Sequence, residues 1–246
     1  MGARQVLATD PAVLSDLATV RLGTAYFRRA LSRLDDSDFD LPSLLPGWSR
    51  RQLVAHVGYN ARAIARLVTW AATGQVNPMY SSPDARGAEI KAGATLRPDA
   101  LRSLCEHAAT DLDVRWRDLS DSRWPEEVRT AQGRTVPASE TLWMRTREVW
   151  LHAVDLDTGA RITEIPQAVL SRLLSDVIAM WDKRDVLDGL LVSSAGPDRP
   201  VRLGSEDPRD EVTGSLPDLV AWATGRTMQS QNLKWSGESR TAPRWL

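Results

Sequence analysis

The sequence predicts a four-helix bundle joined to a smaller domain that mixes helices and strands. The first observation is that four segments before residue 163 repeat apolar residues at the three- and four-residue spacing of amphipathic helices. The second is that the later part of the chain contains short β-branched segments separated by Gly, Pro and Asp. We therefore predict a helical bundle over residues 1–163 and a small α+β domain over residues 164–246.

The first helix is expected to begin at Asp10 and Pro11, because Asp is a favoured N-cap residue and Pro is favoured in the first helical turn. Its apolar residues recur at helical spacing as far as Asp35 and Asp36. A connection marked by proline and glycine, residues 42–47, then leads to the second helix.

The second helix has the clearest boundaries. Ser49 and Gln52 form a capping-box pattern, and Gly74 stands where a helix commonly ends. An apolar stripe runs along one side of this helix, and His56 and Asn60 lie on or beside it. His56 is therefore expected to point toward the core of the bundle.

The second half of the bundle is marked by prolines and glycines. A long connection is expected over residues 77–93, and long loops in compact domains are often functional lids or walls. The third helix should begin at Pro98, and residues 131–135 should form a turn or a short extended piece. From Pro137 the fourth helix is expected to run as far as Gly159.

The rest of the chain has the pattern of an α+β domain. It begins with a helix that starts at residues 165–166. A second helix, residues 219–224, is opened by Ser215, and an extended piece is expected at residues 232–236. Between the two helices the sequence predicts three short strands: 190–194, 201–203 and 211–213.

The composition limits the classes of partner. The 246 residues include 31 Lys and Arg against 32 Asp and Glu, and this balance favours neither nucleic acid nor an anionic membrane over a small molecule. No apolar run reaches the length of a membrane span, and the N-terminus lacks a signal-peptide pattern. Cys105 is the only cysteine, which agrees with a reducing compartment. We expect a cytoplasmic protein. The sequence does not determine its oligomeric state, and a monomer is compatible with it.

Glu148 and His152 lie four residues apart on the expected fourth helix, so their side chains point the same way from neighbouring turns. A Glu–His pair at this spacing is most often a plain interaction on a helix surface. Here apolar residues crowd the segment and indicate that the pair faces inward.

The other two histidines differ in their surroundings. His107 lies on the flank of the third helix and is expected at the surface, whereas His56 lies among apolar positions and needs a polar partner. Two inward histidines and one inward glutamate have the composition of a catalytic zinc site, although these ligands also suit other divalent ions. The alternative is a metal-free bundle with a buried Glu–His pair.

Other catalytic motifs are missing from the sequence. It has no HExxH protease signature, no Gly-rich phosphate loop and no GxSxG nucleophile elbow. Cys105 fits the apolar stripe of the third helix better than the position of a nucleophile. Any thiol chemistry must therefore use a thiol that comes from outside the chain.

Several motifs of the sequence resemble those of one known protein family. The run AQGRTVPASETLWMR, residues 131–145, together with residues 148–150 and 152–156, strongly resembles the mycothiol-dependent maleylpyruvate isomerases. The likeness spans nearly the whole chain through further motifs: Leu45–Trp48, His56–Asn60, Pro78–Tyr80, Pro83–Arg86 and the closing Pro243–Leu246. These motifs are far more specific than the three candidate ligands, which a wide superfamily of DinB-like bundles shares.

The resemblance implies a DinB-like four-helix bundle that binds zinc through His56, Glu148 and His152, followed by the family's small α+β domain. It implies that maleylpyruvate, an intermediate of gentisate degradation, is converted to fumarylpyruvate, with mycothiol as a cofactor that is not consumed. The partners expected are therefore a small dicarboxylate substrate and a low-molecular-weight thiol.

The resemblance also suggests roles for other residues. Arg86 and Arg226 are candidates for gripping the substrate or the cofactor, and Asn60 and Tyr80 are expected beside the cofactor. One alternative is a mycothiol S-transferase that acts on electrophilic toxins with the same three ligands. Another is a non-catalytic metal- or thiol-binding regulator. The two arginines favour a dicarboxylate, and hence the isomerase.

Overall fold

The computed structural model describes residues 5–187, 189–194, 201–205, 207–226 and 232–245, so the last residue of the closing motif, Leu246, lies outside the described residues. The chain forms two compact units, Met1–Ala160 and Arg161–Leu246. The division that we predicted, after residue 163, lies three residues beyond this boundary and within the short helix η3 (Ile162–Glu164). Each unit has its own core.

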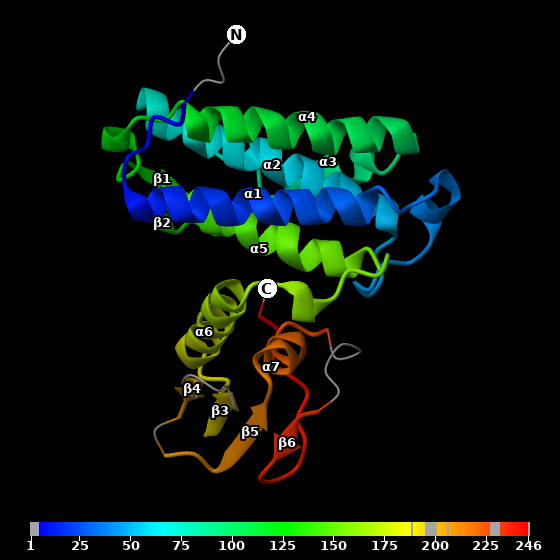
Figure 1. Cartoon of the computed structure of the whole chain (residues 1–246), viewed down its shortest axis with the longest axis vertical. Helices are drawn as coiled ribbons and strands as arrows, with labels where there is room; N and C mark the ends of the chain where they lie inside the picture. The colour runs from blue at the N-terminus through cyan, green and yellow to red at the C-terminus, as the bar shows by residue number, and fades with distance from the viewer. Residues whose placement is uncertain (1–4, 188, 195–200, 206, 227–231, 246) are drawn as a thin grey trace. The chain divides into compact units, whose positions relative to one another are not determined.

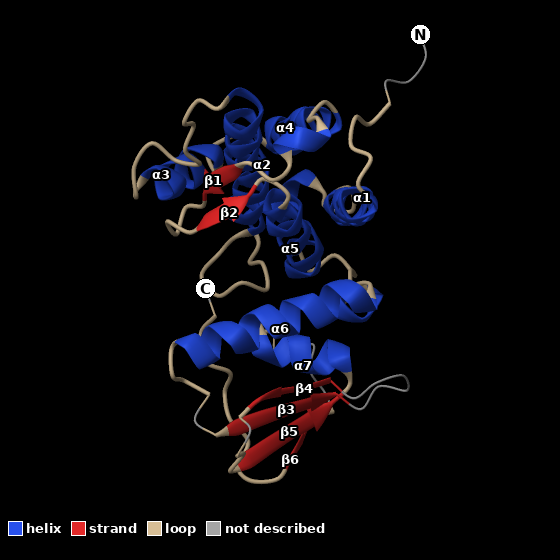
Figure 2. Ribbon diagram, turned by 90° about the vertical axis from the view of Figure 1, so that its left-hand side faces the viewer, coloured by secondary structure: helices blue, strands red, loops and turns tan. Residues whose placement is uncertain are grey.

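The first unit contains the predicted four-helix bundle, as Figures 1 and 2 show. The bundle consists of α1 (Pro11–Leu31), α2 (Arg50–Thr73), α4 (Pro98–Arg117) and α5 (Glu140–Asp155). α1 packs along α5, α2 packs along α4, and α2 also contacts α5. The predicted fold class, a helical bundle followed by a small α+β region, is confirmed. Among the described residues, no helix combines the length and apolar character that a membrane crossing requires.

Local capping explains why the helices begin where the sequence predicts. The carboxylate of Asp10 accepts the backbone N–H of Ala12 at the start of α1. Ser49 and Gln52 form the capping box of α2, and Gly74 ends that helix with a φ of +74°, which suits glycine.

The bundle helices approach closely at two glycines. A Cβ on Gly23 of α1 would lie 2.6 Å from Nε1 of Trp150 on α5. A Cβ on Gly58 of α2 would lie 2.8 Å from Cγ of Leu104 on α4. A larger side chain at either position would push a helix pair apart.

Two predictions about the bundle are wrong in detail. The expected connection over residues 77–93 contains a helix, α3 (Ala85–Gly93), which packs on α2. The fourth helix begins at Glu140 rather than at Pro137, because Pro137 belongs to a hairpin strand, and it ends at Asp155 rather than near Gly159. The hairpin pairs β1 (Glu127–Arg129) with β2 (Thr135–Pro137) around the expected turn.

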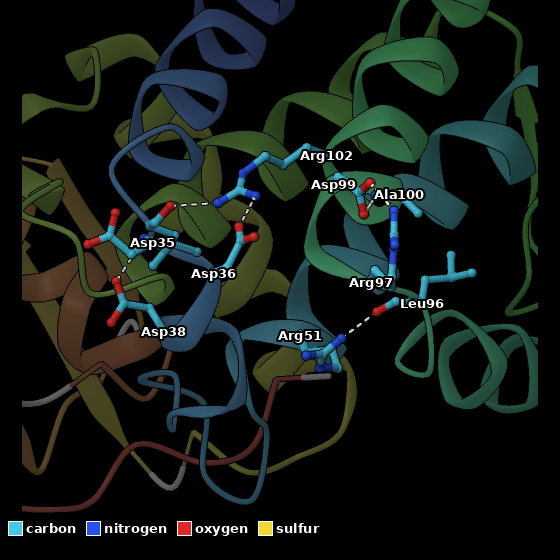
Figure 3. A network of polar contacts seen from close by, with 10 residues as sticks. Asp35, Asp36, Asp38, Arg51, Leu96, Arg97, Asp99, Ala100 and Arg102 are labelled. Carbon is cyan, nitrogen blue, oxygen red and sulfur yellow. Dashed lines mark hydrogen bonds and ion pairs between the residues drawn. The ribbon is translucent and has the colours of Figure 1, made fainter.

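Arginines and aspartates tie together one end of the bundle (Figure 3). Arg102 on α4 donates to Oδ1 of Asp36 over 2.5 Å, and its guanidinium lies 4.8 Å from the ring centroid of Phe39. Arg51 on α2 donates to the carbonyl oxygen of Leu96, just before α4. These contacts hold the short helix η1 (Asp36–Asp40) against the N-terminal ends of α2 and α4. A second short helix, η2 (Asp121–Arg123), follows α4.

The second unit is a four-stranded sheet with helices on one face (Figure 2). The sheet order is β4-β3-β5-β6, in which β3 and β5 are parallel and the edge strands pair antiparallel. The strands lie within two residues of the predicted bounds. They are β3 (Leu190–Ser194), β4 (Val201–Gly204), β5 (Asp210–Gly214) and β6 (Lys234–Trp235), and the helices are α6 (Gln167–Lys183) and α7 (Leu216–Ala223).

Tryptophans connect the layers of the second unit. Trp181 of α6, Trp222 of α7 and Trp235 of β6 form two successive edge-to-face contacts, each with ring centroids 5.4 Å apart. Trp181 is completely buried, and Nε1 of Trp222 donates to the carbonyl oxygen of Arg240. These aromatic contacts fill the core between the helices and the sheet.

Candidate metal centre

Three side chains from two helices meet inside the first unit. Nε2 of His56 on α2 lies 2.8 Å from Oε2 of Glu148 on α5, and Nε2 of His152 lies 3.2 Å from the same oxygen. One potential ligand atom from each residue lies within 4.8 Å of the other two. His56 is buried, and the other two residues are partly exposed. The structure therefore brings together the three residues predicted as ligands.

The two imidazoles are held by their neighbours. Nδ1 of His152 lies 2.8 Å from Oδ2 of Asp155, a completely buried carboxylate, and this contact turns Nε2 toward Glu148. A carboxylate on the outer nitrogen is the usual support for a histidine that binds metal. The ring of Trp48 packs edge-on against His56 with centroids 5.7 Å apart. Trp48 belongs to the motif Leu45–Trp48, which carries part of the family resemblance, but its contact with His56 was not predicted.

The electrostatics suit a cation. Burial lowers the pKa of His56 although Glu148 acts against this effect. Burial tends to raise the pKa of Glu148, but the two imidazoles outweigh it and hold that pKa well below its usual range. Burial likewise tends to lower the pKa of His152, but hydrogen bonds to Asp155 and Glu148 outweigh it and raise that pKa. An ionised carboxylate with two imidazoles is a donor set that fits zinc.

Tyr80 and Arg86 lie near this cluster. Burial raises the pKa of Tyr80. The charge of Arg86 acts to lower this pKa and that of Glu148 to raise it, and the net increase means that the phenol keeps its proton at neutral pH. Arg86, in the first turn of α3, is exposed, and its charge contributes to lowering the pKa of His56. No hydrogen bond or ion pair holds Arg86 among the described residues. Its guanidinium is therefore available to an anion.

Asn60 is buried one turn after His56, and its Oδ1 accepts a hydrogen bond from Nη1 of Arg145 over 2.8 Å. The same Nη1 donates to the carbonyl oxygen of Val57 over 2.8 Å. The predicted contact between Asn60 and the cofactor stays a prediction. Sequence reasoning missed Arg145, although its position three residues before Glu148 places it on the same side of α5.

The other candidate residues are placed as follows. Arg226 follows α7 in the second unit, where it is buried and donates to the carbonyl oxygen of Thr224. Its predicted contact with the substrate stays a prediction.

His107 is exposed on α4, as predicted. Cys105 is buried, its Sγ donates to the carbonyl oxygen of Val54, and burial raises its pKa to about 12. Cys105 is therefore a core residue and no nucleophile.

Comparisons with known proteins agree with this arrangement. The family model described as the mycothiol maleylpyruvate isomerase N-terminal domain matches residues 20–157. A crystal structure of the mycothiol-dependent maleylpyruvate isomerase is 45% identical, with a TM-score of 0.90 over 95% of this chain and 97% of that chain. A crystal structure of a histidine-to-alanine mutant of this isomerase is 44% identical, with a TM-score of 0.89 over the same shares. No curated protein matched the sequence.

The family match, the whole-chain likeness and the cluster on α2 and α5 lead to one assignment. The matched residues 20–157 contain all three candidate ligands and more than half of the chain. The two solved structures extend the likeness through the second unit as well. The chain belongs to the mycothiol maleylpyruvate isomerase family.

Proposed function

We propose that this protein catalyses the mycothiol-dependent cis–trans isomerisation of maleylpyruvate to fumarylpyruvate, a step of gentisate degradation. The observation that carries the proposal is the cluster of His56, Glu148 and His152 in a chain 45% identical, over 95% of its length, to a mycothiol-dependent maleylpyruvate isomerase. The protein's own thiol is buried and protonated, which fits a reaction that takes its thiol from a cofactor.

The three clustered side chains would hold a zinc ion and leave other coordination positions open. Bound zinc and mycothiol together would supply a thiolate at neutral pH, whose reversible addition turns the conjugated double bond into a single bond that can rotate. The carboxylate of Asp155 keeps His152 oriented for this task. No atom is gained or lost overall, so the cofactor is regenerated.

Side chains around the cluster would bind and orient the substrate. Arg86 can pair with one of its two carboxylates, and Arg226 is proposed for the same kind of contact. When the double bond is attacked, negative charge develops on the substrate's carbonyl oxygen, and a guanidinium or a protonated phenol such as that of Tyr80 can stabilise it. Asn60 and Tyr80 are proposed to contact the cofactor.

The test is an isomerase assay with a matched pair of histidine variants. Purified protein, mycothiol and maleylpyruvate should give a steady loss of the substrate's absorbance, and removal of the metal or of mycothiol should abolish it. His56→Ala should lower kcat/KM by about 10³-fold or more, since the metal's contribution amounts to several kcal/mol. His107→Ala, an exposed histidine on α4, should leave it unchanged.

Three results would reject the proposal. The first is that His56→Ala leaves both metal content and turnover unchanged. The second is that the protein accumulates a stable thioether as its end product, which would indicate the S-transferase. Tight binding of mycothiol without turnover of any electrophile would indicate a regulator.

A further inference from the structure

A cavity of about 230 Å³ lies between α1 and α4 in the first unit. α1 packs along α5 and α4 packs along α2, and the residues that line the cavity come from α1 and α4, the first and third helices of the bundle, and from α5. None of the three candidate metal ligands lines this cavity. It is therefore separate from the candidate centre.

Two ion pairs frame the cavity. Nε of Arg21 lies 2.6 Å from Oδ1 of Asp113, and Nη2 of Arg28 lies 2.6 Å from Oε2 of Glu106. The partners are seven residues apart on each helix, which corresponds to two helical turns, or about 10 Å. The pairing order shows that α1 and α4 run in opposite directions. The ion pairs thus form two bridges, one at each end of the cavity.

Between the two ion pairs, the side chains of α1 and α4 that face the cavity are small. They are Thr24 and Ala25 on α1 and Ala109 and Thr110 on α4, and all four line the cavity. Because these side chains are short, they leave a window between the two helices. We call these four residues and the two ion pairs the α1–α4 window.

Arg145 of α5 lines the same cavity and is only 2% exposed. Both hydrogen bonds recorded for its guanidinium leave from Nη1, and none of the described carboxylates forms an ion pair with it. Burial lowers the pKa of Arg145 to about 10, so it stays charged at neutral pH. A buried charge without a counter-ion is costly.

The charge of Glu148 stabilises that of Arg145 from a distance, but no ion pair joins the two side chains among the described residues. Glu148 is engaged with the two imidazoles of the candidate centre, and the Cys105 thiol is protonated at neutral pH. The cavity in contact with Arg145 is the place where an external anion could reach its remaining N–H groups.

We propose that the α1–α4 window admits a small carboxylate with an apolar body, which pairs with Arg145. The planar guanidinium fits a carboxylate through two parallel hydrogen bonds. The apolar body would lie against Val20, Leu112 and Trp116, which also line the cavity. Cavities of about 150 Å³ accept benzene, so the available volume suits an anion the size of benzoate.

The test uses benzoate as the charged probe and benzamide as its uncharged match. Titration calorimetry on metal-stripped protein should show saturable binding of benzoate and at least tenfold weaker binding of benzamide. Metal is removed so that benzoate cannot bind to zinc. Equal binding of both probes would overturn the proposal, since the charge would then not be recognised.

Two substitutions to leucine on α1 locate the site. Ala25→Leu fills the window and should weaken benzoate binding at least tenfold. Ala18→Leu, at an exposed position of α1 outside the cavity, should leave it unchanged. Arg145→Met should also abolish binding, with its folding checked by thermal unfolding. The proposal fails if benzoate does not bind, or if it binds Ala25→Leu as tightly as the parent protein.

Discussion

The two units of the molecule bury different kinds of side chain. The interior of the first unit contains His56, Asn60, Arg145 and Asp155, each with a specific polar partner. The interior of the second unit is built around tryptophans in edge-to-face contact, with Arg226 as its buried charged residue among those described. A polar core costs stability unless every group is paired. The core of the first unit therefore depends on polar pairing, whereas the core of the second is held mainly by packing.

The largest effect on stability is expected in the second unit. Trp181→Ala removes a completely buried ring and should lower the free energy of unfolding of this unit by about 3–5 kcal/mol. If the units are independent domains, as we propose, the first unit of zinc-loaded protein should keep the added zinc. Urea unfolding and elemental analysis would measure the two properties. Loss of zinc together with stability would show that the units depend on each other.

A change in the polar core should affect metal binding more than folding. Asp155→Asn keeps the size of the side chain but removes the charge behind His152, and should weaken zinc binding about 10- to 100-fold. Competition with a chelator measures this change. Asp99→Asn, at an exposed site on α4, serves as the matched control. An unchanged zinc affinity in Asp155→Asn would mean that Asp155 does not support the ligand.

The pH dependence of metal binding sharpens the comparison further. The raised pKa of His152 means that a proton must leave before Nε2 can bind a cation. Zinc affinity should therefore increase with pH, by at most about tenfold per pH unit, and level off above that raised pKa. In Asp155→Asn the plateau should begin at a lower pH, because the hydrogen bond from Asp155 raises the pKa of His152. An affinity independent of pH between about 6 and 9 would contradict this expectation.

The smallest effect concerns the surface network of the first unit. Arg102→Met loses hydrogen bonds to Asp36 and Leu34 and the contact with Phe39, and should lower stability by about 1–2 kcal/mol. Arg97→Met breaks an exposed pair with Asp99 and should have no measurable effect. Thermal unfolding distinguishes the two. Equal effects would mean that the partly buried network contributes no more than an exposed ion pair.

Local signals explain what could be predicted of the fold. Asp10, Ser49 and Pro98 set helix starts through contacts within a few residues, and these starts were predicted correctly. The strand at residues 190–194 was also correct to the residue. α3 was missed because it is short and buries only Ile90 and Gly93, so it has almost no apolar stripe.

Longer-range contacts limit what could be predicted. The start of α5 was misplaced because Val136 pairs with Val128 in a hairpin, which the helical pattern does not reveal. At the candidate centre, apolar surroundings correctly indicated that His56 faces inward, although its partner Glu148 lies 92 residues away, and its role as a metal ligand stays a prediction. The role of Arg145 depends on partners 85 and 88 residues away, and its only local signal was its place three residues before Glu148 on the same helix.

Cys105 has a consequence for oxidative stress. Thiols react with peroxides and disulfides through the thiolate, and burial raises the pKa of Cys105 to about 12, so this thiol keeps its proton at neutral pH. Its burial further shields the sulfur from a bulky disulfide. The protein is therefore expected to meet oxidised mycothiol without forming a mixed disulfide. Its recovery after an oxidative burst would then depend on the supply of reduced cofactor rather than on repair of the polypeptide.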